Sequence, residues 1–563
     1  MSSPRATTRI RRTRPALIAA CTALLALATA CTPEDGESPD PTPSAAPEDA
    51  TTDGSITGDL TLSDLGPDGD TTVFPGGSAQ AAVDQVEQVV DQVLADTGVP
   101  GAAVAIVTGD EVLYTGGFGV RDLTTGEPVD AETVFQIASV SKSVGATVVA
   151  TQVTDGVVSW DDPSHTYLPE LELSDAWVSE HVTIGDLYSH RTGLPHAAGD
   201  LLEDIGYDRT EILQRLVYQP LNPFRTSYAY ANYGTTAGGE AVAHAAGTTW
   251  EDLSQDALYD PLGMTSTSSR HVDYEAAANR ATLHMYLGDG EFEHVAERDP
   301  DPQSPAGGVS STASDLALWL QLLLNDGVGP QGQELIAPEA LQPAITPQSF
   351  SAPASVPQAR SGSYGYGFNV GVTAGGQPKL SHSGAFVIGT GTSFVVLPGL
   401  DVAVVALTNG GPVGAAEAIT ASLADLAEYG EVTRDWAAGY GALFEPYHAP
   451  VGDLAEQDPP ADAAAPQDLA TYTGAWENDY YGEAVVSVAG ETLVAELGPD
   501  GGYVLELQPW DGDTFAFVPT GENAPLGSLS SATFTVPDGT ARAETMTLEF
   551  FDATGLGTWT RAN

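Results

Sequence analysis

The stretch Phe135-Gln-Ile-Ala-Ser-Val-Ser-Lys142 places a serine, Ser139, three residues before Lys142, which is one of only two lysines in a chain of 563 residues. Behind the lysine, valines at helical spacing continue as far as Gly156 and predict a buried helix. Residues at positions i and i+3 of a helix share one face, with their Cβ atoms about 5–6 Å apart. The two side chains are therefore expected to meet in the first turn.

This pair has the chemistry of a nucleophile and its base. A serine hydroxyl reacts poorly until a neighbouring group takes its proton, and a lysine in a dry pocket can lose its charge and become that group. Arginine stays protonated, so Lys142 and Lys379 are the two possible amine bases. An isolated SxxK pattern is more often a surface serine and lysine on a solvated helix, and further motifs must distinguish the two cases.

Two such motifs follow along the chain. Tyr230-Ala-Asn232 lies in an aromatic loop ahead of a helix expected near Thr235. His382-Ser383-Gly384 precedes alternating runs around 392–397 and 402–407 that predict antiparallel strands. Each motif is weak by itself, because aromatic loops often serve only packing and HxG arises by chance. Their order and separation after Ser139 are more specific.

In this order the motifs resemble those of the serine hydrolases related to class C β-lactamases and D-alanyl-D-alanine carboxypeptidases, a family that also includes esterases and D-aminopeptidases. Two further stretches agree, 187–195 and 305–312, so the resemblance covers roughly residues 80–430. It implies an α/β (α+β) body with a mostly antiparallel sheet flanked by helices, together with a helical subdomain. No cofactor is implied.

The resemblance also implies a role for each motif residue. Ser139 would attack a carbonyl carbon to form an acyl-enzyme, and Lys142 would act as general base together with Tyr230. Asn232 would orient the substrate, and the third motif, His382, Ser383 and Gly384, would line its binding site. The oxyanion would lie between the backbone N–H groups of Ser139 and Ala385.

His382 limits the prediction of substrate. Relatives with lysine at this place hold a fixed positive charge for a substrate carboxylate, whereas histidine is only partly charged at neutral pH. We therefore expect small peptide substrates, of D-amino-acid or cell-wall type, or esters. β-Lactamase activity, acyl transfer to an amine and an inactive surface-tethered binding protein on the same scaffold remain alternatives.

Composition excludes several other classes. Acidic residues outnumber Lys and Arg by 77 to 19, giving a formal net charge of −58, which would repel nucleic acid. The excess fits either life in high salt or the solubility of an exported protein. The chain has no GxSxG elbow, Gly307-Gly308 lacks a phosphate-loop context, and His190 and His196 lack zinc spacing, so no metal is expected.

The N-terminal region predicts export. Residues 1–30 combine five arginines with an apolar run too short to span a bilayer, and Cys31 follows in a loose lipobox. A lipid on Cys31 would anchor the protein at the outer face of a bacterial membrane. Arg11-Arg12 leaves open whether export follows the general or the twin-arginine route. Residues 31–78, acidic and rich in proline, are expected to form a disordered tether.

The remaining chain divides into three parts by composition. Residues 79–435 form the predicted hydrolase domain, 436–468 a linker, and 469–563 a second domain of about eight short alternating strands. Thr471–Trp476 and Tyr480–Gly482 resemble the lipocalin-like module that follows some hydrolases of this family. We expect a small antiparallel barrel with a structural or active-site-shaping role rather than its own ligand. The sequence does not predict the oligomeric state.

Overall fold

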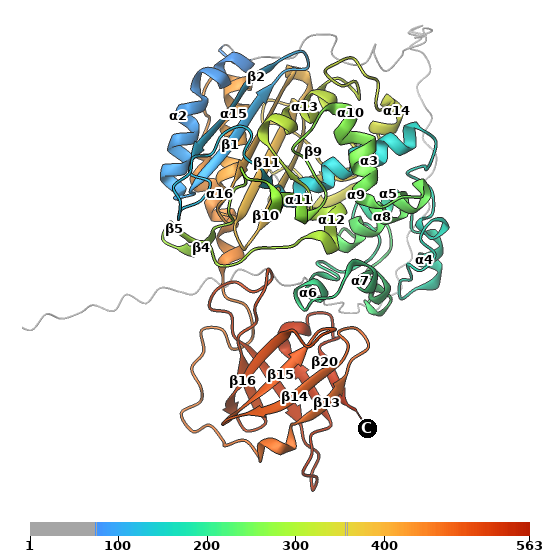
Figure 1. Cartoon of the computed structure of the whole chain (residues 1–563), viewed down its shortest axis with the longest axis vertical. Coiled ribbons are helices and arrows are strands. Elements are labelled where there is room, and N and C mark those ends of the chain that lie inside the picture. The colour runs from blue at the N-terminus through green and yellow to red at the C-terminus, as the bar shows by residue number, and fades with distance from the viewer. Residues whose placement is uncertain (1–73, 75, 355, 357–358, 563) are drawn as a thin grey trace, which may run out of the picture. The chain divides into compact units, whose positions relative to one another are not determined.

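The computed structural model describes residue 74, residues 76–354, residue 356 and residues 359–562, which fall within one compact unit, Gly69–Asn563 (Figure 1). The predicted signal, the lipidation site Cys31 and nearly all of the tether lie outside the described residues. Within the described ranges, no helix is both long enough and apolar enough to cross a membrane. The body combines a sheet with helices and is followed by a closed β-barrel, as predicted.

The body is organised around an eight-stranded antiparallel sheet in the order β2-β1-β12-β11-β10-β9-β8-β7. Strands β1 and β12 are buried on both faces, which explains their nearly continuous apolar sequences; β11 is equally buried, although it begins Thr-Gly-Thr-Ser. In the sequence, the apolar run 102–107 and the run 112–118 on either side of a Thr-Gly-Asp turn predict a β-hairpin, and they form β1 and β2. In chain order the strands are β1 (Gly101–Val107), β2 (Val112–Gly119), β7 (Ser349–Ala352), β8 (Gly362–Tyr364), β9 (Asn369–Val372), β10 (Pro378–Phe386), β11 (Thr390–Leu397) and β12 (Val402–Thr408).

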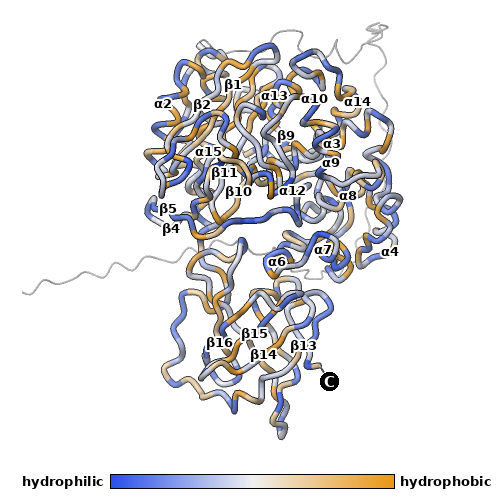
Figure 2. Tube along the Cα trace, in the orientation of Figure 1, coloured by the Kyte–Doolittle hydropathy of each residue, from blue (hydrophilic) through white to orange (hydrophobic). Residues whose placement is uncertain are grey.

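Two long helices, α2 (Ala79–Thr97) and α15 (Ala415–Tyr429), cover one face of this sheet (Figure 1). Ser78 caps the N-terminus of α2, where its side chain accepts a hydrogen bond from the N–H of Ala81. The helical spacing of the valines at 83, 86, 90 and 93 predicts one buried face; Val86, Val90 and Val93 are buried in the core and Val83 is partly buried. The hydropathy trace shows apolar strands inside and hydrophilic loops outside (Figure 2).

The opposite face packs against α3 (Ser141–Thr154) and α13 (Ala313–Leu324). Helix α3 is buried along almost its whole length, because it lies inside the body and not on its surface. The remaining helices of the body are α4 (Ala176–His181), α5 (Ile184–Tyr188), α6 (Asp200–Asp204), α7 (Arg209–Arg215), α8 (Asn232–Ala246), α9 (Trp250–Ser254), α10 (Asp260–Leu262), α11 (His271–Ala276), α12 (Ser304–Gly307) and α14 (Pro338–Leu341). Two short strand pairs accompany them, β3 (Phe135–Gln136) with β6 (Ser310–Ser311) and β4 (Met285–Gly288) with β5 (Glu291–Glu293).

The C-terminal strands close into an eight-stranded antiparallel barrel, which confirms the predicted fold class. Alternate side chains point inward, and Trp476, Phe515 and Trp559 fill the interior. The strands are β13 (Gly474–Glu477), β14 (Ala484–Ala489), β15 (Thr492–Leu497), β16 (Tyr503–Asp511), β17 (Thr514–Phe517), β18 (Ser530–Thr535), β19 (Thr545–Leu548) and β20 (Thr558–Arg561). The barrel shares one apolar cluster with helices α6, α7 and α8 of the body.

Two local features differ from the sequence expectations. The segment predicted as a linker, 436–468, begins with helix α16 (Trp436–Phe444), because Trp436 and Tyr440 pack against the core beside α2 and α15. The 3₁₀ turn Glu445–His448 follows, and residues 449–468 are free of helix and strand. Helix α8 begins at Asn232 and not near Thr235, so the asparagine belongs to the helix and not to the preceding loop.

Candidate active site

Ser139 lies on a short 3₁₀ turn, Ala138–Val140, that leads directly into α3. Ala138 has a φ of 47°, an uncommon conformation for a residue with a side chain. Such strain persists where the surrounding structure fixes the backbone, and it is frequent at functional sites. The turn leaves Ser139 half-buried, while Lys142 in the first turn of α3 is fully buried.

The ammonium nitrogen of Lys142 contacts three oxygen atoms. Nζ lies 3.0 Å from Oγ of Ser139, 2.7 Å from Oδ1 of Asn232 and 2.9 Å from the carbonyl oxygen of Ala306. The amide and carbonyl oxygens can only accept hydrogen bonds. When Lys142 is neutral, its two protons are therefore committed to Asn232 and Ala306, and its lone pair faces the hydroxyl of Ser139.

The surroundings of Lys142 favour that neutral form. Burial lowers the pKa of Lys142 to about 7; the carboxylate of Asp200 opposes this change and the guanidinium of Arg298 assists it. A base with a pKa close to neutrality is well matched to taking and returning a proton. The geometry and the charge state of Lys142 are thus both suited to accepting a proton from Ser139.

Asp200, at the start of α6, extends the site beyond the residues predicted from sequence. Its Oδ2 accepts a 3.0 Å hydrogen bond from Nδ2 of Asn232, which fixes the amide with its oxygen toward Lys142. Burial and neighbouring Glu203 raise the pKa of Asp200 to about 7. No spacing in the sequence links residue 200 to the motifs, because only the fold brings α6 beside α8.

Tyr230 lies next to the same amine, whose Nζ stands 4.6 Å from the centre of the phenol ring. Burial raises the pKa of Tyr230, and contact with the Ser139 side chain opposes that change. The phenol consequently keeps its proton at neutral pH. A protonated phenol thus lies beside an amine whose pKa is near neutrality, and such a pair can donate and accept protons at Ser139.

Strand β10 brings the third motif against the nucleophile. A Cβ on Gly384 would lie 2.3 Å from the carbonyl oxygen of Ile137 and 2.8 Å from the backbone nitrogen of Ser139. Only glycine permits this approach. Ala385 follows on the same strand, where it pairs with Gly391 of β11, so the two backbone nitrogens predicted to hold an oxyanion come from adjacent segments.

His382 is held by two groups. Its Nδ1 is 2.6 Å from the carbonyl oxygen of Ser383, and its Nε2 is 2.8 Å from the hydroxyl of Tyr364. The carbonyl only accepts, so Nδ1 carries the proton and Nε2 accepts from the tyrosine. Burial and the charge of Lys142 lower the pKa of His382 to about 3, and the ring is neutral.

These residues open into a cavity of about 610 Å³, a size typical of small-molecule sites. Ser139, Tyr230, Asn232, His382, Ser383, Gly384 and Ala385 all line it, so the structure brings every predicted substrate and catalytic position except the buried Lys142 to one cavity. Tyr228, Tyr364 and Tyr447 add aromatic rings to the lining.

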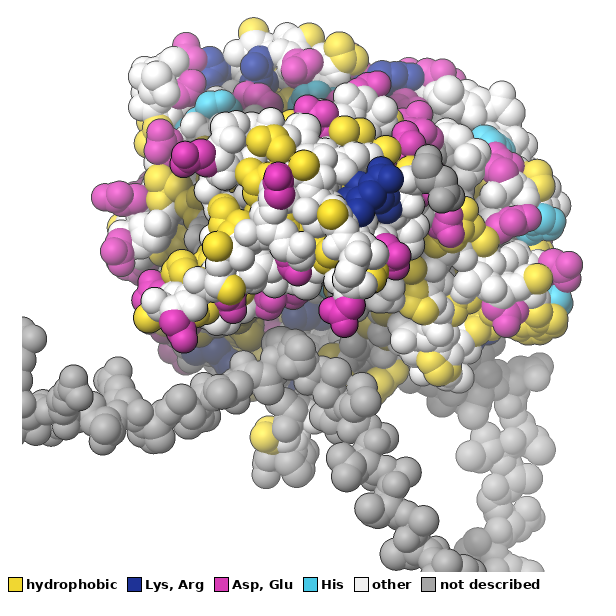
Figure 3. All heavy atoms as spheres, turned by 90° about the horizontal axis from the view of Figure 1, so that it is seen from below, with side chains coloured by type: hydrophobic (Ala, Val, Ile, Leu, Met, Phe, Trp, Pro, Cys, Tyr) yellow, Lys and Arg dark blue, Asp and Glu magenta, His cyan; other side chains and the backbone are white. Residues whose placement is uncertain are grey.

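Arg298 is the one permanent cation among the described residues that line this cavity. Its guanidinium pairs with Glu203 at 2.8 Å and with Glu522 of the barrel at 3.0 Å, and it stacks over Phe386 at 4.2 Å. Acidic side chains are also frequent on the visible surface, where basic ones are few (Figure 3). The cavity thus offers a substrate little free positive charge.

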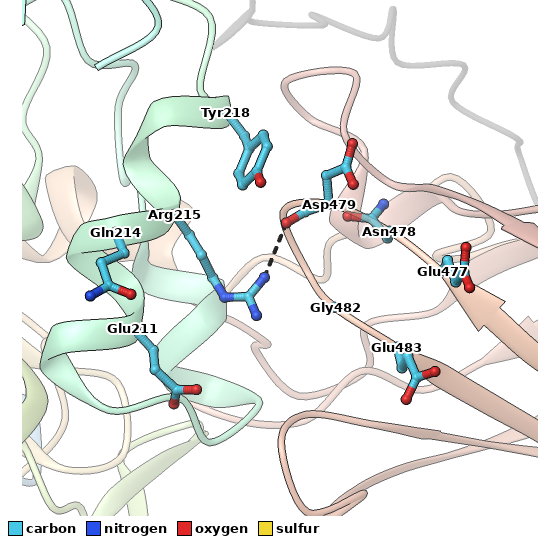
Figure 4. Close-up of a pocket in the computed structure, with 9 residues that line it drawn as sticks. All are labelled: Glu211, Gln214, Arg215, Tyr218, Glu477, Asn478, Asp479, Gly482 and Glu483. Atoms are coloured by element: carbon cyan, nitrogen blue, oxygen red, sulfur yellow. Dashed lines mark hydrogen bonds between the residues drawn. The ribbon is translucent and has the colours of Figure 1, made fainter. Parts of the chain in front are cut away.

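A second hollow of about 710 Å³ lies between α7 and the β13–β14 loop and has a different character (Figure 4). Arg215 reaches across it and donates hydrogen bonds to the carbonyl oxygens of Asp479 and Tyr480, at 3.1 and 2.8 Å. Four of the other eight lining residues are acidic, and no nucleophile with a neighbouring base is among the residues drawn. The hydrogen bonds of Arg215 at this hollow connect the barrel to the body.

Comparison with known families fits the geometry of the first cavity. The family model described as Beta-lactamase matches residues 86–428, more than half of the chain. The chain belongs to the β-lactamase family. A separate model, a domain of unknown function named DUF3471, matches residues 458–556 of this β-lactamase-family protein and covers the barrel strands β13 to β19.

Two curated relatives extend the assignment. Penicillin-binding protein 4 of Amycolatopsis lactamdurans is 32% identical over 324 residues, which are 56% of this chain and 81% of the relative. Esterase EstB of Burkholderia gladioli is 28% identical over 391 residues, covering 63% of this chain and 97% of the esterase. This member of the β-lactamase family is therefore a serine hydrolase.

The fold comparison reaches further along the chain. The octameric penicillin-binding protein homologue from Pyrococcus abyssi matches with a TM-score of 0.52 at 20% identity, covering 85% of this chain and all of that one. A class C β-lactamase from Rhodobacter sphaeroides matches 60% of this chain and 97% of its own length, with a TM-score of 0.50 and 21% identity. At these identities the likeness concerns the fold alone.

Proposed function

We propose that this serine hydrolase acts through an acyl-enzyme on Ser139, with Lys142 as the base, and cleaves small peptides of D-amino-acid or cell-wall type, or esters. One observation carries the proposal: Nζ of Lys142 lies 3.0 Å from Oγ of Ser139 while two pure acceptors occupy its other hydrogen-bonding directions. A surface serine and lysine would not be held in this way.

The residues support a consistent sequence of steps. Oγ of Ser139 bonds to the substrate carbonyl carbon as its proton passes to Nζ of Lys142, and the oxyanion that forms is stabilised by the N–H groups of Ser139 and Ala385. The bond between the carbonyl carbon and the leaving nitrogen or oxygen then breaks, and the leaving atom takes the proton from Lys142, either directly or through the phenol of Tyr230. Water next attacks the acyl carbon and gives a proton to Lys142. The ester bond to Ser139 breaks, Oγ takes that proton back, and the acid is released.

The charges around the cavity support neutral or amine-bearing substrates over carboxylates. His382 is neutral, and Arg298 is already paired with two glutamates, so a substrate carboxylate meets no free cation among the described lining residues. Oδ1 of Asp200 is buried and accepts from no described protein group, which leaves an acceptor for a substrate amine. On this basis β-lactams, which carry a carboxylate, are poor substrates.

We also propose that the enzyme acts outside the cytoplasm, anchored by a lipid on Cys31. The support is the sequence alone: a basic, then apolar N-terminus that ends in a cysteine. Expression of the full chain and a Cys31→Ala variant in a lipoprotein-processing bacterium tests it. Recovery of the wild type in membranes and of the variant outside them supports the anchor, and equal distribution contradicts it.

The decisive test of the activity combines labelling with turnover. The full chain and its Ser139→Ala variant are exposed to a fluorophosphonate probe and examined by intact mass, then assayed with p-nitrophenyl esters, D-amino-acid amides and a chromogenic cephalosporin. We expect one probe per wild-type chain, none on the variant, and turnover of an ester or amide. A folded wild-type protein that neither labels nor turns over any substrate would instead be a binding protein.

A further inference from the structure

The C-terminal barrel contributes residues to the catalytic cavity. The loop between β17 and β18, residues 518–529, places Glu522, Asn523 and Pro525 among the same lining residues as Ser139. These positions lie nearly 400 residues beyond the nucleophile and outside the matched β-lactamase region, 86–428. A wall of the site therefore comes from the second domain.

Glu522 makes the most specific of these contacts. Its Oε1 accepts a 2.6 Å hydrogen bond from the N–H of Val387, and its Oε2 a 3.3 Å bond from the N–H of Ile388. Both donors belong to the turn that connects β10 to β11, two and three residues beyond Ala385. A carboxylate on backbone N–H groups forms a strong, charge-assisted contact.

Arg298 strengthens this connection from a second direction. It pairs with Glu522 at 3.0 Å and stacks on Phe386, the residue between Ala385 and the turn. Arg298 lies in the hydrophilic segment between β5 and α12 (Figure 2) and its side chain is only 9% exposed. A buried pair of this kind is costly to break from one side, because the partner is left as an uncompensated charge.

Asp204 at the end of α6 holds the barrel loop in register. Its carboxylate accepts from the N–H of Glu522 at 3.2 Å, and from the N–H and side-chain amide of Asn523 at 3.3 and 2.8 Å. Gly521 makes this approach possible, since a Cβ there would lie 2.7 Å from the Asp204 carboxyl carbon, and its φ is 111°. The same helix begins with Asp200, the partner of Asn232.

We propose that Glu522 of the barrel is a positioning residue for catalysis, which holds the β10–β11 turn and thereby the oxyanion-binding N–H of Ala385 in place. The barrel is then an integral part of the active site and not an appendage. This inference rests on the proposed acyl-enzyme mechanism. It goes beyond that mechanism by assigning catalytic geometry to a domain of unknown function.

The test compares variants of the full chain. Glu522→Ala removes both acceptors, and we expect kcat for the best ester or amide to fall at least tenfold with KM changed less than threefold, since an oxyanion donor acts in the transition state. Glu522→Gln keeps one acceptor for Val387 and should recover part of the loss. The matched control is Arg215→Ala, which removes a barrel contact away from the cavity and should leave kcat unchanged.

Each outcome has one meaning. The proposal is overturned if Glu522→Ala is folded by circular dichroism and keeps the kcat of the wild type. It is also overturned if Arg215→Ala loses as much kcat as Glu522→Ala, because any weakening of the contact between barrel and body would then be enough to lower kcat. If Glu522→Ala does not fold, the isosteric Glu522→Gln decides alone: a kcat below wild type at unchanged KM supports the proposal, and wild-type kcat overturns it. Wild-type protein without fluorophosphonate labelling would instead refute the underlying mechanism.

Discussion

Lys142 and Asp200 are joined through a single side chain: Oδ1 of Asn232 accepts from Nζ of Lys142 at 2.7 Å, and Nδ2 of the same amide donates to Oδ2 of Asp200 at 3.0 Å. The bridge keeps a carboxylate close to the amine without direct contact. An acid at this distance favours the charged form of lysine and so raises its pKa, against the effect of burial. Asp200, held by Asn232, therefore raises the pKa of Lys142, the proposed base, while burial lowers it.

A pH profile tests this tuning. Lys142 accepts a proton only as the free amine, so kcat/KM is expected to rise as the pH increases through about 7 and then level off. In Asp200→Asn the carboxylate that raises the pKa of Lys142 is absent, while an acceptor for Asn232 remains, and the rising limb should move to lower pH. A limb that stays in place, or moves to higher pH, would contradict the electrostatic role of Asp200.

The two lysines provide a matched pair of variants. Lys142→Met removes the base, and we expect kcat/KM to fall by about 10²–10⁴, the usual range for a general base. Lys379→Met removes the other lysine, on β10, and should retain activity within a factor of two. Initial rates of ester hydrolysis and fluorophosphonate labelling measure both. Comparable losses in the two variants would mean that Lys142 acts through general charge or stability.

Tyr230 makes a different prediction from a tyrosinate base. Because burial raises its pKa, the phenol stays protonated over the working range, so no limb of the profile should follow its ionisation. Tyr230→Phe is expected to slow turnover by about 10²-fold without shifting the limb near pH 7, since the loss is of proton relay and hydrogen bonding. Tyr218→Phe, at a 44% exposed position, is the control. A limb displaced in Tyr230→Phe would identify the tyrosine as part of the base.

The sequence predicted the motif residues of the site but not the groups that support them. Ser139, Lys142, Asn232 and Gly384 follow from local patterns, since each is a residue type that its position requires. Asp200, Arg298, Tyr364 and Glu522 occur in stretches with no distinctive spacing, and only tertiary packing brings them together. Their chemistry is that of partners, which depends on distance and not on order along the chain.

Some secondary-structure elements could likewise be predicted from local sequence, whereas others depend on tertiary packing. The strands β1, β11 and those of the barrel were predictable from their sequences. Burial of one face requires alternating apolar residues and burial of both faces favours apolar runs, so the pattern of residues indicates a strand. Helix α16 was not, because Trp436 and Tyr440 gain their partners only when the segment packs beside α2 and α15. The contribution of the barrel to the catalytic cavity could not be predicted either, because it depends on how one loop, residues 518–529, packs against the body.

Gly384 tests the close approach of β10 to the nucleophile. In Gly384→Ala the new Cβ meets the carbonyl oxygen of Ile137 at 2.3 Å and the hydroxyl of Thr392 at 2.5 Å, so the strand must shift away from Ser139. We expect loss of activity by at least 10²-fold, because the oxyanion site is disturbed, and destabilisation by about 1–3 kcal/mol from overpacking. Denaturant titration and ester kinetics measure the two effects.

Gly371 supplies the control for that variant. It lies on β9, one strand from β10, and a Cβ there meets no described atom within 4 Å. Gly371→Ala should therefore keep full activity and nearly full stability. An active Gly384→Ala protein would show that β10 can move without loss of the oxyanion site, and would remove the reason given for glycine at this position.

His382 decides whether the cavity selects against carboxylates. Replacing the neutral ring by a lysine places a cation where His382 now contacts Tyr364, and we expect His382→Lys to raise the ratio of cephalosporin to neutral-ester kcat/KM at least tenfold. His382→Gln has no charge and should leave that ratio near the wild-type value, although both variants disturb the same hydrogen bonds. Thermal midpoints confirm that each is folded. If His382→Lys does not raise the ratio above that of His382→Gln, the charge at this position does not limit the turnover of carboxylate substrates. The pairing of Arg298 with Glu203 and Glu522 would then be the next feature to test.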